Sequence, residues 1–247
     1  MTLAGPNAIS LNPKLDAVSL ARQFADNGRL QIADFLMPDA AEALRTHLCG
    51  RTDWRHVING DSQIFEIPAD QYDALPVAER QRIEEAMFAK AGHGFQFQFD
   101  TIRVPDGRAA RLASASPIDV FAQLMSAPAT LAFLSTVTGA ASIAFADTQA
   151  TRYRKGDFLT RHDDAVAGKN RQLAYVLGMT PGWQAEWGGL LLFNDPDGGV
   201  IDVVTPRFNS LSLFAVRQPH SVSYIAPYAP LERLSLTGWL RAEPPPD

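Results

Sequence analysis

The stretch Arg233-Leu234-Ser235-Leu236-Thr237-Gly238-Trp239-Leu240, near the end of the chain, decides the fold. Apolar residues alternate in it with an arginine, two hydroxyl residues and a tryptophan, which is typical of a strand with two different faces. The leucine face belongs to a core. The face of Arg233 turns inward only where it binds something, because a buried guanidinium without an anion costs several kcal/mol of desolvation. The alternative is an exposed face on which Arg233 pairs with Glu232 or another acid.

The region upstream of this strand reads as further short strands separated by turns. Pro181-Gly182, Gly188-Gly189 and the run Asp195 to Gly199 supply the breaks. About eight short antiparallel strands within one hundred residues predict a double-stranded β-helix, or jelly-roll, core. The predicted strands are 142–153, 159–163, 172–179, 189–194, 200–204, 210–215, 220–225 and 233–240.

The first half of the chain is mixed, and its helices are expected to buttress one sheet of the jelly roll. We predict a mainly β protein with flanking helices, folded as a single domain over 1–247. It divides into a support region, 1–140, a catalytic core, 141–241, and a flexible tail, 242–247. The polar segment 104–111 is either a mobile lid over the site or a plain disordered loop. The helical patterns are 15–27, 38–47, 77–91, 117–125 and 129–137, and the strand patterns are 29–36 and 95–99.

Composition excludes several classes of protein. A chain of 247 residues that is 46% hydrophobic can bury one substantial core. Its net charge of −5 argues against a nucleic-acid partner. The single cysteine, Cys49, cannot form an internal disulfide, and no apolar run is long enough for a membrane span or a leader. We therefore expect a cytoplasmic protein that is not associated with a membrane. The oligomeric state is not readable from these features.

A metal site is suggested by His162 and Asp164, together with His220 further along the chain. Side chains at i and i+2 of a strand point the same way, which favours Asp164 over Asp163 as the partner of His162. Two imidazoles and one carboxylate on one face of a metal form the facial triad of non-haem Fe(II) oxygenases. A His-x-Asp pair alone is a weak pattern, and polar loop residues are the alternative. The nearby Arg233 adds the planar fork that the carboxylate of a 2-oxo acid requires.

Residues Tyr153 to Trp239 resemble the prolyl-hydroxylase branch of the Fe(II)/2-oxoglutarate-dependent dioxygenases, including the ribosomal-protein and oxygen-sensing prolyl hydroxylases. The resemblance covers about 90 residues and at least five spaced elements. These elements are Tyr153, His162-Asp163-Asp164, Leu173 to Leu177, Pro181-Gly182-Trp183 with Gly188-Gly189, His220, and Arg233 to Trp239.

This resemblance implies roles for six residues. His162, Asp164 and His220 would bind Fe(II), and Arg233 would hold the distal carboxylate of the co-substrate 2-oxoglutarate. Dioxygen would be the second co-substrate, and ascorbate is a further candidate cofactor. Because halogenating relatives replace the acid of the triad with a small residue, its presence favours hydroxylation. The two remaining residues, Ser235 and Tyr153, would line the same pocket.

One position departs from the family. Relatives carry a tyrosine near the end of the strand that follows His-x-Asp, where this chain has Gly178. Tyr175 has the opposite parity on that strand and cannot replace it. The co-substrate pocket must therefore be completed differently, or the protein uses a different 2-oxo acid.

The resemblance implies hydroxylation of a prolyl residue in a protein or peptide substrate. The same chemistry on a free amino acid or small metabolite is the first alternative. A non-catalytic jelly-roll module that binds a metal is the second. The remaining histidines, His47, His56 and His93, have no ligand-like spacing and are expected to be ordinary surface or core residues.

Overall fold

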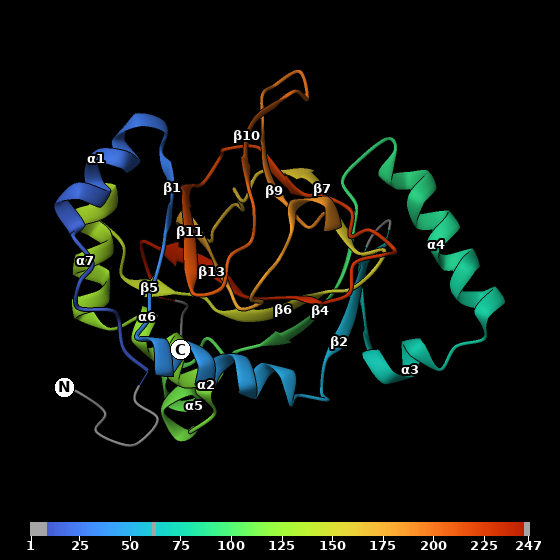
Figure 1. Cartoon of the computed structure of the whole chain (residues 1–247), viewed down its shortest axis with the longest axis horizontal. Coiled ribbons are helices and arrows are strands. Elements are labelled where there is room, and N and C mark those ends of the chain that lie inside the picture. The colour runs from blue at the N-terminus through green and yellow to red at the C-terminus, as the bar shows by residue number, and fades with distance from the viewer. Residues whose placement is uncertain (1–8, 61–62, 245–247) are drawn as a thin grey trace.

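The computed structural model describes residues 9–60 and 63–244. Its central feature is an antiparallel sheet that curls into a nearly closed barrel (Figure 1), the predicted jelly roll flanked by helices. Along the main path the strand order is β1-β11-β8-β13-β6-β4-β7-β12-β9-β10. The strands of this sheet are β1 (Arg29–Ile32), β2 (Arg55–Asn59), β3 (Ile64–Pro68), β4 (Phe97–Arg103), β5 (Phe145–Ala146), β6 (Gln149–Tyr153), β7 (Phe158–His162), β8 (Arg171–Gly178), β9 (Leu191–Asn194), β10 (Val200–Val204), β11 (Ser210–Ala215), β12 (His220–Val222) and β13 (Arg233–Arg241).

Helix α1 (Ala17–Asn27) begins and ends at residues that cap it. Asp16 accepts from the backbone N–H groups of Val18 and Ser19 and so caps α1. Gly28 ends that helix with φ of 66°, a left-handed conformation that glycine adopts without strain. The helices are α1 (Ala17–Asn27), α2 (Pro38–Cys49), α3 (Ala69–Asp73), α4 (Val77–Ala91), α5 (Arg108–Ala113), α6 (Pro117–Met125), α7 (Pro128–Thr138) and the 3-10 helix η1 (Ala185–Trp187).

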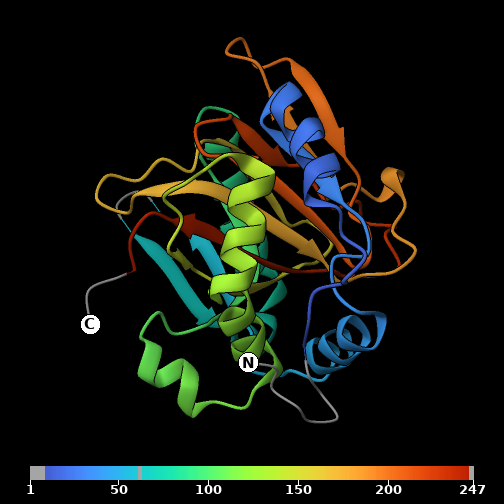
Figure 2. The same ribbon diagram turned by 90° about the vertical axis from the view of Figure 1, so that its left-hand side faces the viewer.

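The main hydrophobic core lies between one face of the sheet and a layer of helices. Strands β8, β11 and β13 contribute alternate residues to it, including Leu177, Leu213 and Leu236, which are fully buried. The helices α1, α2, α6 and α7 cover this face, and Figure 2 shows α7 (yellow-green) crossing in front of the strands. The alternation in β13 therefore buries its leucines against helices and leaves its polar face for the barrel interior.

Several sequence boundaries require correction. The predicted strand 142–153 is interrupted, and β5 and β6 are its two separate parts. The strand predicted over 29–36 ends at Ile32. The hairpin of β2 and β3 was not predicted, because its short segments lack a clear alternation of apolar and polar residues. Residues 245–247 of the predicted tail lie outside the described residues.

The segment 104–111, for which a lid and a plain loop were both open, is partly helical. Its second half begins helix α5, and Arg111 is 3% exposed. The Arg111 guanidinium donates to the carbonyl of Ala146 at 2.9 Å and lies over the ring of Phe145. None of the residues 104–107 and 109–111 lines the large cavity inside the barrel. The buried arginine anchors this segment to the strand layer, away from that cavity.

No single helix within 9–60 and 63–244 is both long enough and apolar enough to cross a membrane. Helices α6 and α7 meet that criterion only when they are joined across a bend of 56°.

Candidate active site

Two histidines face each other across neighbouring strands inside the barrel. His162 is the last residue of β7, His220 is the first of β12, and the two are direct partners in the antiparallel ladder. Asp164 lies two residues beyond His162, after β7 has ended. Its carboxylate is 3.5 Å from Nε2 of His162 and 3.4 Å from Nε2 of His220. The ligand atoms of all three side chains lie within 4.8 Å of one another, so the predicted triad is assembled.

Backbone carbonyls orient both imidazoles. Nδ1 of His162 is 3.0 Å from the carbonyl of Thr160, and Nδ1 of His220 is 2.9 Å from that of Gln218. Because a carbonyl can only accept, each Nδ1 carries a proton, and Nε2 is the nitrogen of each ring that is left to bind a metal next to Asp164. Burial, with His162 adding a smaller effect, lowers the pKa of His220 to about 4. A neutral ring is the form that binds a metal.

Asp164 is 7% exposed and is the only carboxylate of the group. Burial by itself raises the pKa of Asp164, but His162, His220 and the indole of Trp239 outweigh it and lower that pKa below its ordinary value. The side chain is therefore an anion held between two imidazoles. An anionic oxygen with two neutral nitrogens on one side is the donor set that Fe(II) takes in the facial triad.

The triad opens into a cavity of about 500 Å³. Its floor is a row of aromatic rings, in which Phe95, Phe97, Phe99 and Tyr153 follow one another at centroid distances of 5.1–5.5 Å. Phe95 is also 5.5 Å from the ring of His162. Strand β4 supplies Phe97 and Phe99 from the face that also carries the cavity, because alternate residues of a strand share a side. The row leads from the metal site to Arg233.

Arg233 lies at the deep end of this cavity and is 3% exposed. Its guanidinium is 5.0 Å from the centroid of the Tyr153 ring, and burial lowers its pKa. Within the described chain Arg233 makes no hydrogen bond or salt bridge, and its Nε is buried without a partner. The hydroxyl of Ser235, fully buried two residues along β13, is also without a partner. Arg233 therefore does not form the surface ion pair considered above as an alternative.

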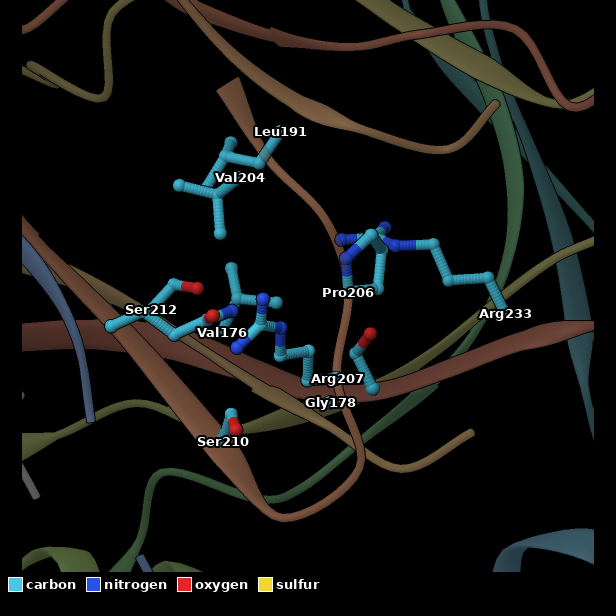
Figure 3. A pocket seen from close by; sticks show the side chains of 11 residues that line it. Val176, Gly178, Leu191, Val204, Pro206, Arg207, Ser210, Ser212 and Arg233 are labelled. Atoms are coloured by element: carbon cyan, nitrogen blue, oxygen red, sulfur yellow. The ribbon is translucent and has the colours of Figure 1, made fainter. Parts of the chain in front are cut away.

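Gly178 is explained by the chain that packs against it. A Cβ atom at this position would be 2.2 Å from the carbonyl oxygen of Arg207, much closer than atoms can approach. Gly178, Arg207, Arg233 and Ser235 line a small cavity of about 10 Å³ behind the main one. Figure 3 shows the side chains of Arg207 and Arg233 among the residues of this cavity. The loop before β11 thus fills the space that a larger residue would need.

The side chain of Tyr175 points away from Gly178 and the small cavity, as its opposite parity on β8 predicted. Its hydroxyl donates to the carbonyl of Asp147 at 2.6 Å and lies 2.7 Å from the hydroxyl of Thr148. The ring belongs to the main core beside Phe121. The tyrosine is therefore committed to the packing of the helical layer.

Two residues next to the triad were not predicted to belong to the site. Trp239 lines the cavity, and its indole lies near enough to Asp164 to affect the pKa of that carboxyl. The guanidinium of Arg171 is 3.4 Å from the centroid of the Trp239 ring, and its Nε is buried without a partner. Because Trp239 lies on the same face of β13 as Arg233, its position in the alternating pattern could have predicted that it lines the site. Arg171 carried no comparable signal.

The unpaired groups fit a 2-oxo acid that binds beside a metal. His162, Asp164 and His220 would hold Fe(II). The buried guanidinium of Arg233 and the hydroxyl of Ser235 lack acceptors, and a carboxylate supplies oxygens for both. The cavity runs without interruption from the triad to Arg233. A dicarboxylic 2-oxo acid could therefore bind with one end at the metal site and its distal carboxylate at Arg233 and Ser235.

Comparison with known proteins agrees with this geometry. Residues 148–241 match the model of the 2OG-Fe(II) oxygenase superfamily. Prolyl 3-hydroxylase OGFOD1 of Mus musculus is 31% identical over 115 residues, which are 44% of this chain and 21% of that protein. The chain thus matches about a fifth of the length of this curated relative.

Solved structures share the fold. A prolyl-4-hydroxylase of Pseudomonas putida aligns with a TM-score of 0.58 and 21% identity, over 92% of this chain and 98% of that one. A prolyl hydroxylase of Trichoplax adhaerens, solved with a peptide fragment of hypoxia inducible factor, aligns with a TM-score of 0.58 and 16% identity, over 92% and 89%. The region 148–241, which carries the assembled His162–Asp164–His220 triad, is thus similar to the 2OG-Fe(II) oxygenase superfamily, and the solved structures share its fold.

Proposed function

We propose that this chain hydroxylates a prolyl residue of a protein or peptide substrate. The observation that carries the proposal is the apolar character of the cavity beside the triad. Phe97 and Phe99 line its interior, and Ile64, Phe95 and Val166 line it while remaining 54%, 49% and 48% exposed. Large apolar side chains that stay exposed around a cavity mark a binding surface. A proline ring offers apolar C–H bonds to such a surface, and the relatives named above are prolyl hydroxylases.

In this proposal each residue of the site has a separate task. His162, Asp164 and His220 bind Fe(II), with the imidazoles locked by their Nδ1 hydrogen bonds. Arg233 and Ser235 hold the distal carboxylate of 2-oxoglutarate, stacked against Tyr153. The backbone of Arg207 closes the pocket on the side of Gly178. When bound, Fe(II), 2-oxoglutarate and dioxygen supply the oxidising chemistry that hydroxylates a C–H bond and releases succinate and carbon dioxide.

The buried surroundings support this division of tasks. The aromatic row excludes water from the space between the triad and the substrate, which limits side reactions of a reactive oxidant. The lowered pKa values of His220 and Asp164 keep the His220 ring neutral and the Asp164 carboxylate anionic at neutral pH. The protein thereby contributes geometry and shielding, and the metal contributes the reactivity.

A free amino acid or another small carboxylate is the second candidate substrate. Arg103 and Arg171 line the same cavity, and the buried Nε of Arg171 has no hydrogen-bond partner among the described residues. A substrate carboxylate would supply an acceptor for it. This pairing would place a small anionic substrate near Asp164.

The test is oxygen-dependent formation of succinate from 2-oxoglutarate with Fe(II), measured with proline-containing peptides and, separately, with free amino acids. Stimulation by a peptide, together with the gain of one oxygen atom on proline by mass spectrometry, supports the proposal. Stimulation by free amino acids alone supports the second candidate. Absence of oxygen-dependent succinate under every condition would overturn both, and would leave a metal-binding jelly-roll module.

A further inference from the structure

A second cavity lies on the opposite face of the strands that build the active site. Its volume is about 420 Å³, and it is bounded by α3, α4, β2, β4 and the loops at 154–157 and 229–232. Figure 1 shows α3 and α4 beside β2 at the end of the molecule far from α1 and α7. Along β2 and β4, Val57, Phe97 and Phe99 face the iron site, whereas His56 and Gln98 face this second cavity. The two cavities therefore share strands but not side chains of those strands.

A buried histidine–aspartate pair forms the wall of this cavity. His56 and Asp100 are cross-strand partners in β2 and β4, with Nδ1 2.8 Å from a carboxylate oxygen. Both residues are almost completely buried, at 1% and 0% exposed. Arg152 and Arg154 also contact Asp100, at 2.7 and 3.0 Å, and keep it ionised. Because an ionised carboxylate only accepts, Nδ1 of His56 carries a proton, and Nε2 is the ring nitrogen left without a partner.

Four buried polar atoms among the residues that line this cavity have no hydrogen-bond partner within the described chain. They are Nε2 of His56, the hydroxyl of Tyr72, Nε of Arg80 and Oε1 of Gln98. Three of these residues, His56, Tyr72 and Gln98, are 1%, 5% and 3% exposed. Leaving one buried polar group unsatisfied costs about 1–3 kcal/mol. Four such groups around one cavity indicate a ligand that satisfies them.

The kinds of atom define the chemistry of that ligand. Arg80 and Tyr72 offer an N–H and an O–H donor, and burial raises the pKa of Tyr72 to about 12, so the hydroxyl keeps its proton. Gln98 offers an acceptor through Oε1, because its amide nitrogen is already bonded to the carbonyl of Gly156, and His56 adds Nε2 as a further unpaired polar atom. The ring of His56 stacks on that of Tyr72, with 4.0 Å between the two ring centroids.

Charge and shape narrow the choice further. The lining contains the carboxyl groups of Asp73, Glu84, Asp157 and Glu232. Of its basic side chains, Arg154 is paired with Asp73 and Asp100, whereas Arg80 and Lys155 have no salt bridge to any described residue. An unpaired guanidinium and an unpaired phenol that line one cavity can together bind a carboxylate. Ala229, Pro230 and Leu231 supply an apolar wall. A volume of 420 Å³ is within the range of small-molecule sites.

We propose that this cavity binds a small carboxylate that carries an adjacent N–H or O–H donor, as amino acids and hydroxy acids do. Its carboxylate is held by Arg80 and Tyr72, and its donor group is accepted by Oε1 of Gln98. The site is distinct from the pocket for 2-oxoglutarate, because the strands β2 and β4 separate the two.

The test is calorimetric titration of the Fe(II)-loaded protein with saturating 2-oxoglutarate in the absence of oxygen, so that the active site is already filled. The probes are L-serine and L-glutamine as amino acids, L-lactate and L-malate as hydroxy acids, and acetate as a carboxylate without the donor. We expect at least one amino or hydroxy acid to bind at millimolar concentration or below, and acetate to bind about tenfold more weakly. Binding of the amino acids or of the hydroxy acids shows to which of these two classes of compound the ligand belongs.

Two variants tie that binding to this cavity. Tyr72→Phe removes a hydroxyl that has no protein partner, so the melting temperature without ligand should stay the same or rise, while binding weakens about tenfold. Arg80→Gln should weaken binding of the same acid by a similar factor. Tyr224→Phe is the matched control, because Tyr224 packs against Phe88 of α4 but does not line the cavity. It should bind as the unmodified protein does.

Three results would overturn the proposal: no heat with any probe at millimolar concentration, equal affinity in Tyr72→Phe, or equal loss in Tyr224→Phe. None of them depends on turnover, so failure here is distinguishable from failure of the proposed hydroxylation.

Discussion

The carbonyl oxygen of Arg207 lies only 2.2 Å from the position that a Cβ atom on Gly178 would take. Gly178 is paired with Ser210 on one side and Ser235 on the other, so it is fixed within the sheet. The amide of Asn209 also donates to its carbonyl at 2.8 Å. The strand cannot move away from Arg207 without breaking these bonds, and position 178 must remain glycine.

Gly178→Ala should therefore lower the free energy of unfolding by about 1–3 kcal/mol, since the added methyl group forces the Arg207 backbone to shift. Denaturant titration measures this change. Gly94→Ala is the control, because a Cβ there meets nothing within 4 Å, and it should have little effect. Equal stability of the two variants would show that the 206–207 segment moves freely.

Arg233→Met should have opposite effects on stability and on co-substrate binding. The buried guanidinium has no acceptor in the described chain, so its removal should leave the protein without 2-oxoglutarate equally stable or more stable. The KM for 2-oxoglutarate should rise about tenfold to a hundredfold, because a charge-assisted hydrogen bond is lost. A KM that stays unchanged would remove Arg233 from the co-substrate pocket.

Asp164→Ala should reduce Fe(II)-dependent formation of succinate to background, since it removes the anionic ligand of the triad. Asp163→Asn is the matched control. Asp163 is exposed, and its side-chain oxygen accepts from the amide of Ala165, a bond that asparagine preserves. The control should keep most of the turnover. Comparable activity in the two variants would contradict the ligand assignment.

Asp157 predicts a pH dependence of stability. Burial raises the pKa of Asp157 well above its ordinary value, although the Arg154 amide and the nearby arginines oppose this. A carboxyl whose folded pKa is raised is stabilising below its unfolded pKa, and this contribution is lost as the pH rises through the folded pKa. Asp157→Asn does not ionise and can still accept from the Arg154 amide. The variant should therefore be more stable than the unmodified protein at neutral pH.

The size of this difference should shrink as the pH falls toward 4, where the unfolded carboxyl also becomes protonated. Melting temperatures of the two proteins, measured side by side across this range, give the comparison. A constant difference at all pH values would mean that Asp157 stays ionised when buried.

The sequence allowed prediction of the parts of the site that lie on regular strands. The period of two in β13 places Arg233 and Ser235 inside the barrel, and the spacing of His162 and Asp164 anticipates the triad. Periodicity could not show that Trp239 and Arg171 stack beside Asp164, because that contact joins two strands. Element boundaries were less accurate where strands are short, as at β2 and β3.

The second cavity was outside the reach of sequence reasoning for a related reason. His56 and Asp100 are 44 residues apart, and only the pairing of β2 with β4 makes them neighbours. A single histidine in a mixed region is indistinguishable from a core histidine until its partner is known. The orphaned atoms of Tyr72 and Gln98 likewise depend on three-dimensional packing.

The alternation of β4 has a consequence for the evolution of this chain. Phe97 and Phe99 point to the cavity at the triad, and Gln98 and Asp100 point to the opposite side of β4, toward the second cavity. A shift of β4 by one residue would therefore exchange the side chains on its two faces. The side chains of Gln98 and Asp100 would then enter the apolar cavity at the triad. The rings of Phe97 and Phe99 would take the place of Asp100 beside His56. An insertion or deletion inside 97–100 should consequently disrupt the lining of both cavities at once. The exposed hairpin tip at 196–199 should, by contrast, tolerate a change of length better.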